Sequence, residues 1–283
     1  MMSAGVIGWP IAHSKSPLIH RFWLSKLGLD GDYGRFAVAP ERLGDAIRAL
    51  PALGLRGVNV TVPHKVAVMA HLDKVDALAA TVGAVNTVVV DDGALVGHNT
   101  DVAGFAEPLL PELASSSVVK SDHRVTLIGS GGAARAVATA LISWEVTIHG
   151  RNAARTRHLV DDLTPHGFFG HVGTIAELSD TSPWFSERYN HYIVNATTLG
   201  MTGQPPLAIN LDTYPDDTIV YDLVYAPLET PLLAAARARG LRTIDGLSML
   251  IGQAAAAFEL FFGAPAPREH DAELRALLVR ASP

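Results

Sequence analysis

The sequence predicts an α/β protein with two α/β domains, of which the N-terminal one contains a mostly parallel mixed sheet. Short β-branched runs alternate with longer amphipathic stretches along almost all of the 283 residues. At about 150 residues per domain, this length suits one large domain or two ordinary ones. A glycine-rich turn that begins at Gly129, directly after an apolar run, marks the start of a second strand–helix series near the middle of the chain.

Strands and helices alternate through the first hundred residues. We expect strands over 6–11, 36–38 and 57–62, and helices over 17–27, 41–50 and 65–72. Ser16 is the expected N-cap of the first helix, with Pro17 at its first position. Residues 86–90 and 94–97 flank Asp91-Asp92-Gly93, a pattern typical of a β-hairpin.

The second series follows a polar segment, 115–123, which we interpret as a surface loop. Strands are expected over 125–129, 146–148, 192–195, 218–221 and 242–244, and a helix from Gly131. The last two helices, 248–262 and 268–279, follow a full set of strands, so we expect them to pack on the first unit. The predicted domains are therefore 1–103 plus 247–283, and 104–246.

Composition excludes several classes of protein. With 22 basic and 28 acidic residues the net charge is −6, which disfavours nucleic-acid binding. A hydrophobic fraction of 48% excludes disorder, and the absence of Cys excludes disulfides, a thiolate nucleophile and a Cys-ligated metal. No apolar stretch approaches about 18 residues and the first residues lack a signal-peptide pattern, so we expect no membrane span and a cytoplasmic location.

The glycine turn predicts a dinucleotide-binding, Rossmann-like second domain. Gly129 permits a tight turn, Gly131 lets backbone N–H groups approach a pyrophosphate, and the small Ala134 allows close packing of helix on strand. The helix that begins here directs the positive end of its dipole toward an anion. The alternative is a turn with a purely structural role.

The end of the next strand predicts which dinucleotide is bound. NAD enzymes usually carry an acid there that binds the ribose 2′-OH, but this strand ends in His149-Gly150-Arg151-Asn152 and Arg155 follows. Two guanidinium groups suit a 2′-phosphate, which predicts NADP(H). Two solvated arginines are the alternative, although positive charge is unfavourable at the start of a helix.

Four polar segments follow or precede strand ends in the first domain, where open α/β sheets bind ligands: residues 13–17, 59–65, 83–87 and 99–101. Each has a structural interpretation of its own, because Ser16 suits a helix cap, Asn59 a turn or sheet, and Asp101 an N-cap. Together they supply hydroxyls, amides, one ammonium and one carboxylate, which suit a small polyhydroxylated acid.

These motifs resemble the shikimate dehydrogenase family over nearly the whole chain. The resemblance rests on Ser14-Lys15-Ser16, residues 59–65, 83–87 and 99–101, the glycine turn, Asn195-Ala196-Thr197, and the segment from Asp245-Gly246 to Gly252-Gln253. It implies NADPH-dependent, reversible reduction of 3-dehydroshikimate to shikimate in the biosynthesis of aromatic amino acids through chorismate.

The resemblance also implies the role of each site residue, with no metal. The implied catalytic pair is Lys65 and Asp101. The implied substrate contacts are Ser14 and Ser16 to the carboxylate, Asn59, Thr61, Asn86 and Gln253 to the ring hydroxyls, and Tyr225 near the carboxylate. The implied cofactor contacts are Gly129, Ser130, Gly131, Gly132 and Ala133 to the pyrophosphate, Arg151 and Arg155 to the 2′-phosphate, and Leu223 and Gly246 along the nicotinamide. Gly150 and Asn152, on either side of Arg151, are also implied cofactor contacts; the family usually has Asn-Arg-Thr here, and the missing Asn side chain at Gly150 is expected to weaken the adenosine side.

The chemistry of the pair follows from its groups. An ammonium beside the carbonyl oxygen stabilises the negative charge that grows as hydride arrives, and it can deliver a proton. Asp101, if close, holds that ammonium; which of the two donates the proton stays open, because coupled groups titrate as a unit.

Three other functions compete with this interpretation. A quinate/shikimate dehydrogenase would favour NAD, against which the missing acid after Ile148 speaks. A non-catalytic metabolite sensor would need neither Lys65 nor Asp101. A metal-dependent hydrolase lacks a His-Glu-x-x-His motif. We expect a small-molecule substrate and leave monomer and homodimer open.

Overall fold

The computed structural model describes residues 1–110, 123–179 and 189–281, and it divides into two compact units. Unit 1 comprises Met1–Gly104 and Leu250–Ala281, and unit 2 comprises Phe105–Met249. The predicted surface loop at 115–123 lies outside the described residues except for His123. Among the described residues, no helix is long and apolar enough to span a membrane.

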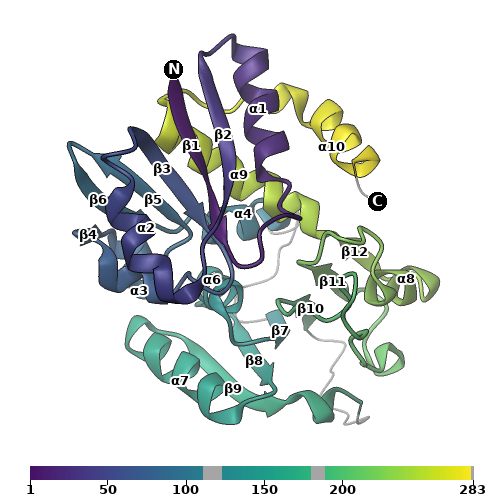
Figure 1. Ribbon diagram of the computed structural model, residues 1–283. Coiled ribbons are helices and arrows are strands. Elements are labelled where there is room, and N and C mark those ends of the chain that lie inside the picture. Colours follow the sequence, from purple (N-terminus) through teal and green to yellow (C-terminus); the bar gives the residue numbers. More distant parts are fainter. Residues whose placement is uncertain (111–122, 180–188, 282–283) are drawn as a thin grey trace. The chain divides into compact units, whose positions relative to one another are not determined.

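Unit 1 is built on a six-stranded mixed sheet (Figure 1). Its strands are β1 (Met2–Gly8), β2 (Gly31–Ala37), β3 (Leu55–Val60), β4 (Lys74–Val75), β5 (Thr87–Asp91) and β6 (Ala94–His98), in the order β2-β1-β3-β5-β6-β4. β5 runs antiparallel to β3 and to β6, and the other three pairings are parallel. The predicted mostly parallel mixed sheet is confirmed.

Helices flank this sheet. They are α1 (Ser16–Leu27), α2 (Leu43–Ala49), α3 (Ala77–Val82), α4 (Asp101–Ala106), α9 (Gly246–Phe262) and α10 (Asp271–Arg280), with short 3-10 turns η1 (Pro40–Arg42), η2 (Ala67–His71), η3 (Glu107–Leu109) and η8 (Arg268–His270). The chain passes from one unit to the other within α4 and within α9. α10 packs on α1, which in turn lies against β2, as Figure 1 shows.

Of three local predictions in unit 1, one is confirmed and two are wrong. The β5–β6 hairpin is confirmed: Asp92 and Gly93 both have positive φ, as a tight two-residue turn requires. The predicted helix over 65–72 is wrong. The Lys65 carbonyl accepts from the N–H of Val85, and the N–H of Met69 donates to the Val66 carbonyl, so this segment forms only the 3-10 turn η2. Ser16 is not an N-cap but the first residue of α1.

Unit 2 contains a six-stranded sheet in which every pairing is parallel. Its strands are β7 (His123–Ile128), β8 (Glu145–Gly150), β9 (Phe169–Thr174), β10 (Asn190–Asn195), β11 (Ile219–Asp222) and β12 (Arg242–Ile244), in the order β12-β11-β10-β7-β8-β9. This is the doubly wound order of dinucleotide-binding domains, so the predicted Rossmann-like fold is confirmed. β9 was not predicted, because its sequence Phe-Gly-His-Val-Gly-Thr carries two glycines and little apolar character.

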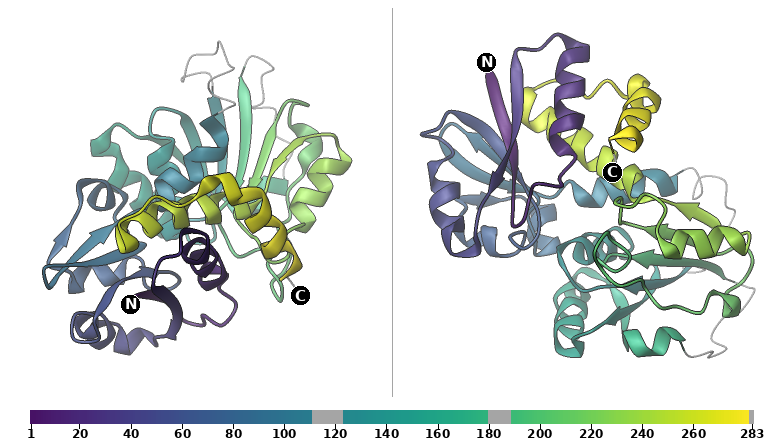
Figure 2. Two further views of the ribbon diagram at one scale, coloured as in Figure 1. Left: turned by 90° about the horizontal axis from the view of Figure 1, so that it is seen from above. Right: turned by 45° about the vertical axis from the view of Figure 1, so that its right-hand side comes forward.

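Helices and 3-10 turns join the strands of unit 2 (Figure 2). They are α6 (Gly132–Ala140), α7 (Ala153–Leu163), α8 (Pro231–Ala238), η5 (Thr164–His166), η6 (Ile175–Ser179) and η7 (Leu211–Thr213).

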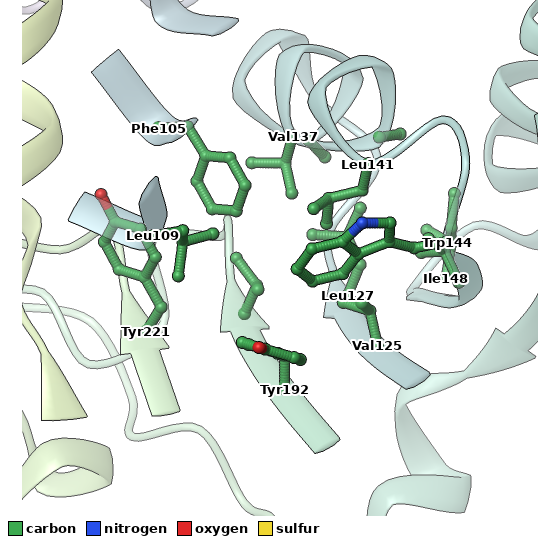
Figure 3. Packing of buried hydrophobic residues seen from close by; sticks show 14 of the residues in the cluster. Phe105, Leu109, Val125, Leu127, Val137, Leu141, Trp144, Ile148, Tyr192 and Tyr221 are labelled. Carbon is green, nitrogen blue, oxygen red and sulfur yellow. The ribbon is translucent and has the colours of Figure 1, made fainter. Parts of the chain in front are cut away.

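Side-chain alternation shows that both faces of this sheet are covered. In β10, Tyr192 and Val194 belong to one buried cluster while Ile193, between them, belongs to another. The first cluster joins the sheet to α6, α7, η3 and the end of α4. Phe105 of α4 stacks on Tyr221 with ring centroids 5.1 Å apart (Figure 3). The second joins it to η7 and α8. Two buried faces account for the nearly continuous apolar strands in the sequence.

The end of β8 is packed too tightly for a side chain. A Cβ built on Gly150 would lie 2.0 Å from Thr156 Oγ1, in the first turns of α7. Thr156 is fully buried and its hydroxyl donates to the Asn152 carbonyl at 3.1 Å, so it has no room to yield. Gly150 therefore lets β8 and α7 approach each other closely.

Gly150→Ala is expected to lower the free energy of unfolding by about 1–3 kcal/mol, the usual range for overpacking. Because the new methyl group would collide with the Thr156 hydroxyl, Gly150→Ala should lower the free energy of unfolding less when Thr156 is already Ala. Urea titration of the wild type, the two single variants and the double variant measures this difference. Gly131→Ala is the control, since its Cβ would meet no atom within 4 Å. Equal costs in both backgrounds would contradict the steric explanation.

An aromatic cluster in unit 1 encloses His20 of α1. The imidazole is fully buried and stacks on Tyr33 with centroids 4.0 Å apart, and Trp23 and Phe258 lie close by. Neither ring nitrogen has a hydrogen-bond partner within the described part of the chain. Burial in these surroundings lowers the pKa of His20 from its ordinary 6.5 to about 3.

Stability should therefore fall as the medium becomes acidic. Below about pH 6.5 the unfolded chain binds a proton at His20 and the native chain does not, which costs about 2 kcal/mol at pH 5. Urea titration at pH 7.5 and pH 5 measures this effect. Between these two pH values the free energy of unfolding of His20→Phe should fall by about 2 kcal/mol less than that of the wild type. The exposed His166→Gln is the control. An unchanged pH dependence in His20→Phe would refute this explanation.

Candidate active site

A buried ion pair joins Lys65 and Asp101 in unit 1. Lys65 follows β3, and Asp101 is the first residue of α4, directly beyond β6. The Nζ–Oδ2 distance is 2.5 Å, and the side chains are 15% and 5% exposed. The structure thus brings together the two residues expected to form a catalytic pair.

Strand order explains why these two residues meet. β5 lies between β3 and β6 and runs antiparallel to both. The ends of β3 and β6 and the beginning of β5 therefore reach the same edge of the sheet. That edge collects Lys65, Asn86 and Asp101 from three segments of the chain.

The second carboxylate oxygen of Asp101 is also held. Asn86 Nδ2 donates to Asp101 Oδ1 at 2.9 Å. Asn99 Oδ1 accepts from the backbone N–H groups of Asp101 and Val102, at 3.0 and 3.3 Å, so Asn99 caps the start of α4. The interpretation of Asp101 as a helix cap is therefore wrong, and its carboxylate is left to hold the Lys65 ammonium.

A chain of buried polar groups continues from Asn86. Thr87 Oγ1 donates to Asn86 Oδ1 at 3.0 Å and accepts from Asn59 Nδ2 at 3.0 Å. Tyr33 Oη donates to Asn59 Oδ1 at 2.6 Å. Asn59 and Asn86, both expected to contact substrate, therefore also belong to the support of Asp101.

Ser14, in the turn before α1, lies next to Ser16, the first residue of that helix. Both are buried, and their hydroxyl oxygens are 3.3 Å apart. Arg35 donates from Nε and Nη2 to the Ser14 carbonyl at 2.8 and 2.6 Å, and Lys15 Nζ donates to the Leu278 carbonyl at 2.9 Å. The Arg35 guanidinium thus holds the backbone of the loop that carries these hydroxyls, and its charge favours an anionic group there.

The other residues expected to bind substrate are more dispersed. Thr61 lies one residue beyond β3 and is partly buried. Gln253, on α9, donates from Nε2 to the Leu250 carbonyl at 2.9 Å. Tyr225 follows β11 in unit 2. Among the residues that the structure describes, no hydrogen bond joins Thr61 or Gln253 to Lys65 or Asp101.

The glycine turn of unit 2 fits a pyrophosphate. Gly129 has φ +119° and its missing Cβ would lie 3.0 Å from the Ala196 carbonyl oxygen, so only glycine suits this close approach. Gly131 stands at the N-cap of α6 without a side-chain cap, and a Cβ there would meet open space. Ser130, Gly132 and Ala133 complete the turn and the start of α6, and all three are of intermediate exposure. The dipole of α6 favours an anion at this place.

Two arginines lie next to this turn. Arg155 Nε donates to the Ser130 carbonyl at 3.1 Å, which ties α7 to the glycine turn. Arg151 is exposed and has no partner among the residues that the structure describes. Asn152 caps α7 by accepting from Arg155 N–H at 3.0 Å, so its side chain has a structural task. Gly150 offers no side chain here, for the steric reason given above.

The backbones of Leu223 and Gly246 are closely packed in the same unit. A Cβ on Gly246 would lie 2.4 Å from the Leu223 carbonyl oxygen. The preceding residue, Asp222, accepts from Asn195 Nδ2, Val224 N–H and Thr230 Oγ1 at 2.9, 3.0 and 2.6 Å. Burial raises the pKa of Asp222, and these three donors oppose that rise. The carboxyl group fixes the backbone on which Leu223 stands.

Sequence reasoning missed several residues of the site. Arg35, Tyr33, Thr87 and Asn99 all support predicted site residues, but only Thr87 and Asn99 lie within the motifs that the sequence singles out. Arg35 and Tyr33 lie in β2 and carry no local signal. Among the described residues there is no cluster of His, Asp and Glu able to hold a metal.

Comparison with known proteins identifies the family. Residues 6–88 match the family described as "Shikimate dehydrogenase substrate binding domain", and residues 246–273 match "Shikimate 5'-dehydrogenase C-terminal domain". A protein of Sphingopyxis alaskensis named shikimate dehydrogenase (NADP(+)) is 50% identical over 280 residues, covering 98% of this chain and 96% of its own.

Solved structures agree with this match. Shikimate 5-dehydrogenase of Thermus thermophilus in complex with NADP(H) and shikimate has a TM-score of 0.82 at 34% identity, covering 98% of this chain and 100% of its own. Quinate dehydrogenase of Corynebacterium glutamicum in complex with NAD has a TM-score of 0.85 at 32% identity, covering 98% and 99%. At 50% identity over almost its whole length, the chain belongs to the shikimate dehydrogenase family.

Proposed function

We propose that this protein is an NADP-dependent shikimate dehydrogenase that reversibly reduces 3-dehydroshikimate to shikimate in aromatic amino-acid biosynthesis. Family membership supports the reaction. The observation that carries the site is the Lys65–Asp101 pair, with 2.5 Å between Nζ and Oδ2. It offers an ammonium, held by a carboxylate, to a carbonyl oxygen.

Proton delivery follows from the contacts of this pair. When bound, NADPH supplies the hydride that adds to the carbonyl carbon. The Lys65 ammonium stabilises the negative charge that develops on the oxygen, and one proton from the Lys65–Asp101 pair passes to that oxygen to complete the hydroxyl. Asp101 accepts from Lys65 and from Asn86, so it keeps the ammonium in one position.

Substrate binding is assigned mainly to polar groups of unit 1. Ser14 and Ser16 donate to the carboxylate, while Arg35, bound to the Ser14 carbonyl, adds positive potential to their loop. Asn59, Thr61, Asn86 and Gln253 contact the ring hydroxyls, and Tyr225 lies near the carboxylate. Neutral donors hold the anion without the desolvation cost of a buried ion pair.

Cofactor binding is assigned to unit 2. The turn at 129–133 holds the pyrophosphate, Arg151 and Arg155 hold the 2′-phosphate, and Leu223 and Gly246 line the nicotinamide. Arg155 is already anchored through Nε, so its terminal amino groups need little ordering to grip a phosphate. In this proposal the substrate domain is 1–103 plus 247–283 and the cofactor domain is 104–246. Cytoplasmic location and a monomeric or homodimeric state stay predictions.

Quinate oxidation with NAD is the second candidate, since a quinate dehydrogenase is among the similar structures. The strand end at 149–152 carries no acid for a ribose 2′-OH, which argues against it. Steady-state assays with shikimate and quinate, each with NADP and with NAD, separate the two. Shikimate with NADP should give the highest kcat/KM, and a preference for quinate with NAD would overturn the proposal.

Replacing the ammonium tests the chemistry. Lys65→Met should lower kcat by roughly 10²–10⁴-fold, the usual contribution of general acid–base catalysis, with a smaller change in KM for shikimate. The control is Lys74→Met, which removes an exposed lysine of β4 in the same unit. A Lys65→Met enzyme with near-normal kcat would remove this residue from the reaction.

Removing both arginines tests the choice of cofactor. Arg151→Ala with Arg155→Ala should raise KM for NADPH by roughly 10- to 100-fold, because charged hydrogen bonds to phosphate are lost, and should change KM for NADH little. Arg157→Ala is the control on the same helix, since Arg157 is exposed. Equal losses with both cofactors would show that the arginines do not distinguish the 2′-phosphate.

A further inference from the structure

We infer that Thr87 is a positioning residue for the reaction, because its hydroxyl fixes the amide of Asn86 and thereby the Asp101 carboxylate that holds Lys65. The inference rests on the proposed function and adds a residue to it. Thr87 itself is fully buried, while Asn59 and Asn86 on either side of it are 6% and 2% exposed. Thr87 therefore acts through its neighbours, not by touching substrate.

Hydrogen-bond geometry sets the direction of the Thr87 hydroxyl. Asn59 Nδ2, which can only donate, lies 3.0 Å from Thr87 Oγ1, so the hydroxyl accepts there. Its single proton is then available for Asn86 Oδ1, also at 3.0 Å. The alternative acceptor, Thr100 Oγ1, is farther away at 3.4 Å.

This direction determines how the Asn86 amide is oriented. Asn86 Oδ1 accepts from Thr87 and from the backbone N–H of Thr100, the latter at 2.8 Å. Its Nδ2 group consequently faces Asp101 Oδ1 and Thr100 Oγ1, both at 2.9 Å. A flipped amide would turn a carbonyl oxygen toward a carboxylate, which is repulsive. Thr87 thus helps to hold the one orientation that supports Asp101.

The far end of the chain is anchored in the core. Tyr33 donates to Asn59 Oδ1 at 2.6 Å, which leaves the Asn59 amino group to face Thr87. The tyrosine is fully buried and stacks on His20 with ring centroids 4.0 Å apart. Burial also raises the pKa of Tyr33 well above its ordinary value, so the hydroxyl keeps the proton that it donates.

Removing only the hydroxyl tests this role. Thr87→Val keeps the shape of the side chain but leaves Asn59 Nδ2 and Asn86 Oδ1 each without one partner. We expect kcat for shikimate oxidation to fall about 10-fold or more, with a smaller change in KM. Thr87→Ser, which retains the hydroxyl, should recover most of the loss.

A second measurement reads the Asn86 amide directly. The side-chain ¹⁵N–H₂ signals of Asn86, assigned through Asn86→Asp, should exchange with solvent slowly in the wild type. In Thr87→Val these signals should change chemical shift and exchange faster. In Thr87→Ser they should return to their wild-type shifts and exchange rates. Thr218→Val is the matched control, because Thr218 is equally buried and its hydroxyl has no partner among the residues described. It should alter neither kcat nor these signals.

The outcomes separate this inference from the proposed function. Wild-type protein that oxidises neither shikimate nor quinate would refute the proposed function, while the amide signals would still test the role of Thr87. Normal kcat in Thr87→Val, unchanged Asn86 signals, or failure of Thr87→Ser to recover activity would each overturn the inference. Should Thr87→Val not fold, Tyr33→Phe removes the hydroxyl at the far end; unchanged kcat and Asn86 signals in that variant would overturn the inference equally.

Discussion

The ion pair between Lys65 and Asp101 imposes the strongest constraint on unit 1. Its two charges are largely removed from water, and attraction between the charges repays their desolvation only if the remaining hydrogen-bonding positions are also satisfied. Asp101 meets this requirement with Asn86 on one oxygen and Lys65 on the other. The polar groups around Asp101 thus offset part of the desolvation of the pair.

Those groups depend in turn on the mixed sheet. An all-parallel sheet would place the beginning of β5 at the opposite edge from the ends of β3 and β6, and Asn86 would not reach Asp101. The antiparallel β5 between two strands of the other direction is therefore what assembles the site. The tight turn at Asp92 and Gly93 returns the chain immediately and makes this arrangement possible.

Two buried polar groups in unit 1 illustrate different consequences of burial. Thr87 sits in a chain whose members each find partners, and such a network holds its side chains in one arrangement. His20 lies within an aromatic cluster, and neither ring nitrogen finds a partner in residues 1–110, 123–179 or 189–281, so burial keeps the imidazole neutral. In unit 2, Asp222 resembles Thr87: three donors surround its buried carboxyl group and fix the backbone beside Leu223.

Sequence alone determined the α/β class, the two series of strands, the glycine turn and the arginines beside it, because each of these is a pattern of neighbouring residues with a local physical cause. The motifs also pointed to Lys65, Asp101 and Asn86. Only the tertiary structure decided that Asn99 caps α4, that Arg35 holds the Ser14 loop, and that Tyr33 and Thr87 stand behind Asn86. These contacts join residues whose proximity follows from strand order and register, which the alternation of apolar and polar residues does not specify.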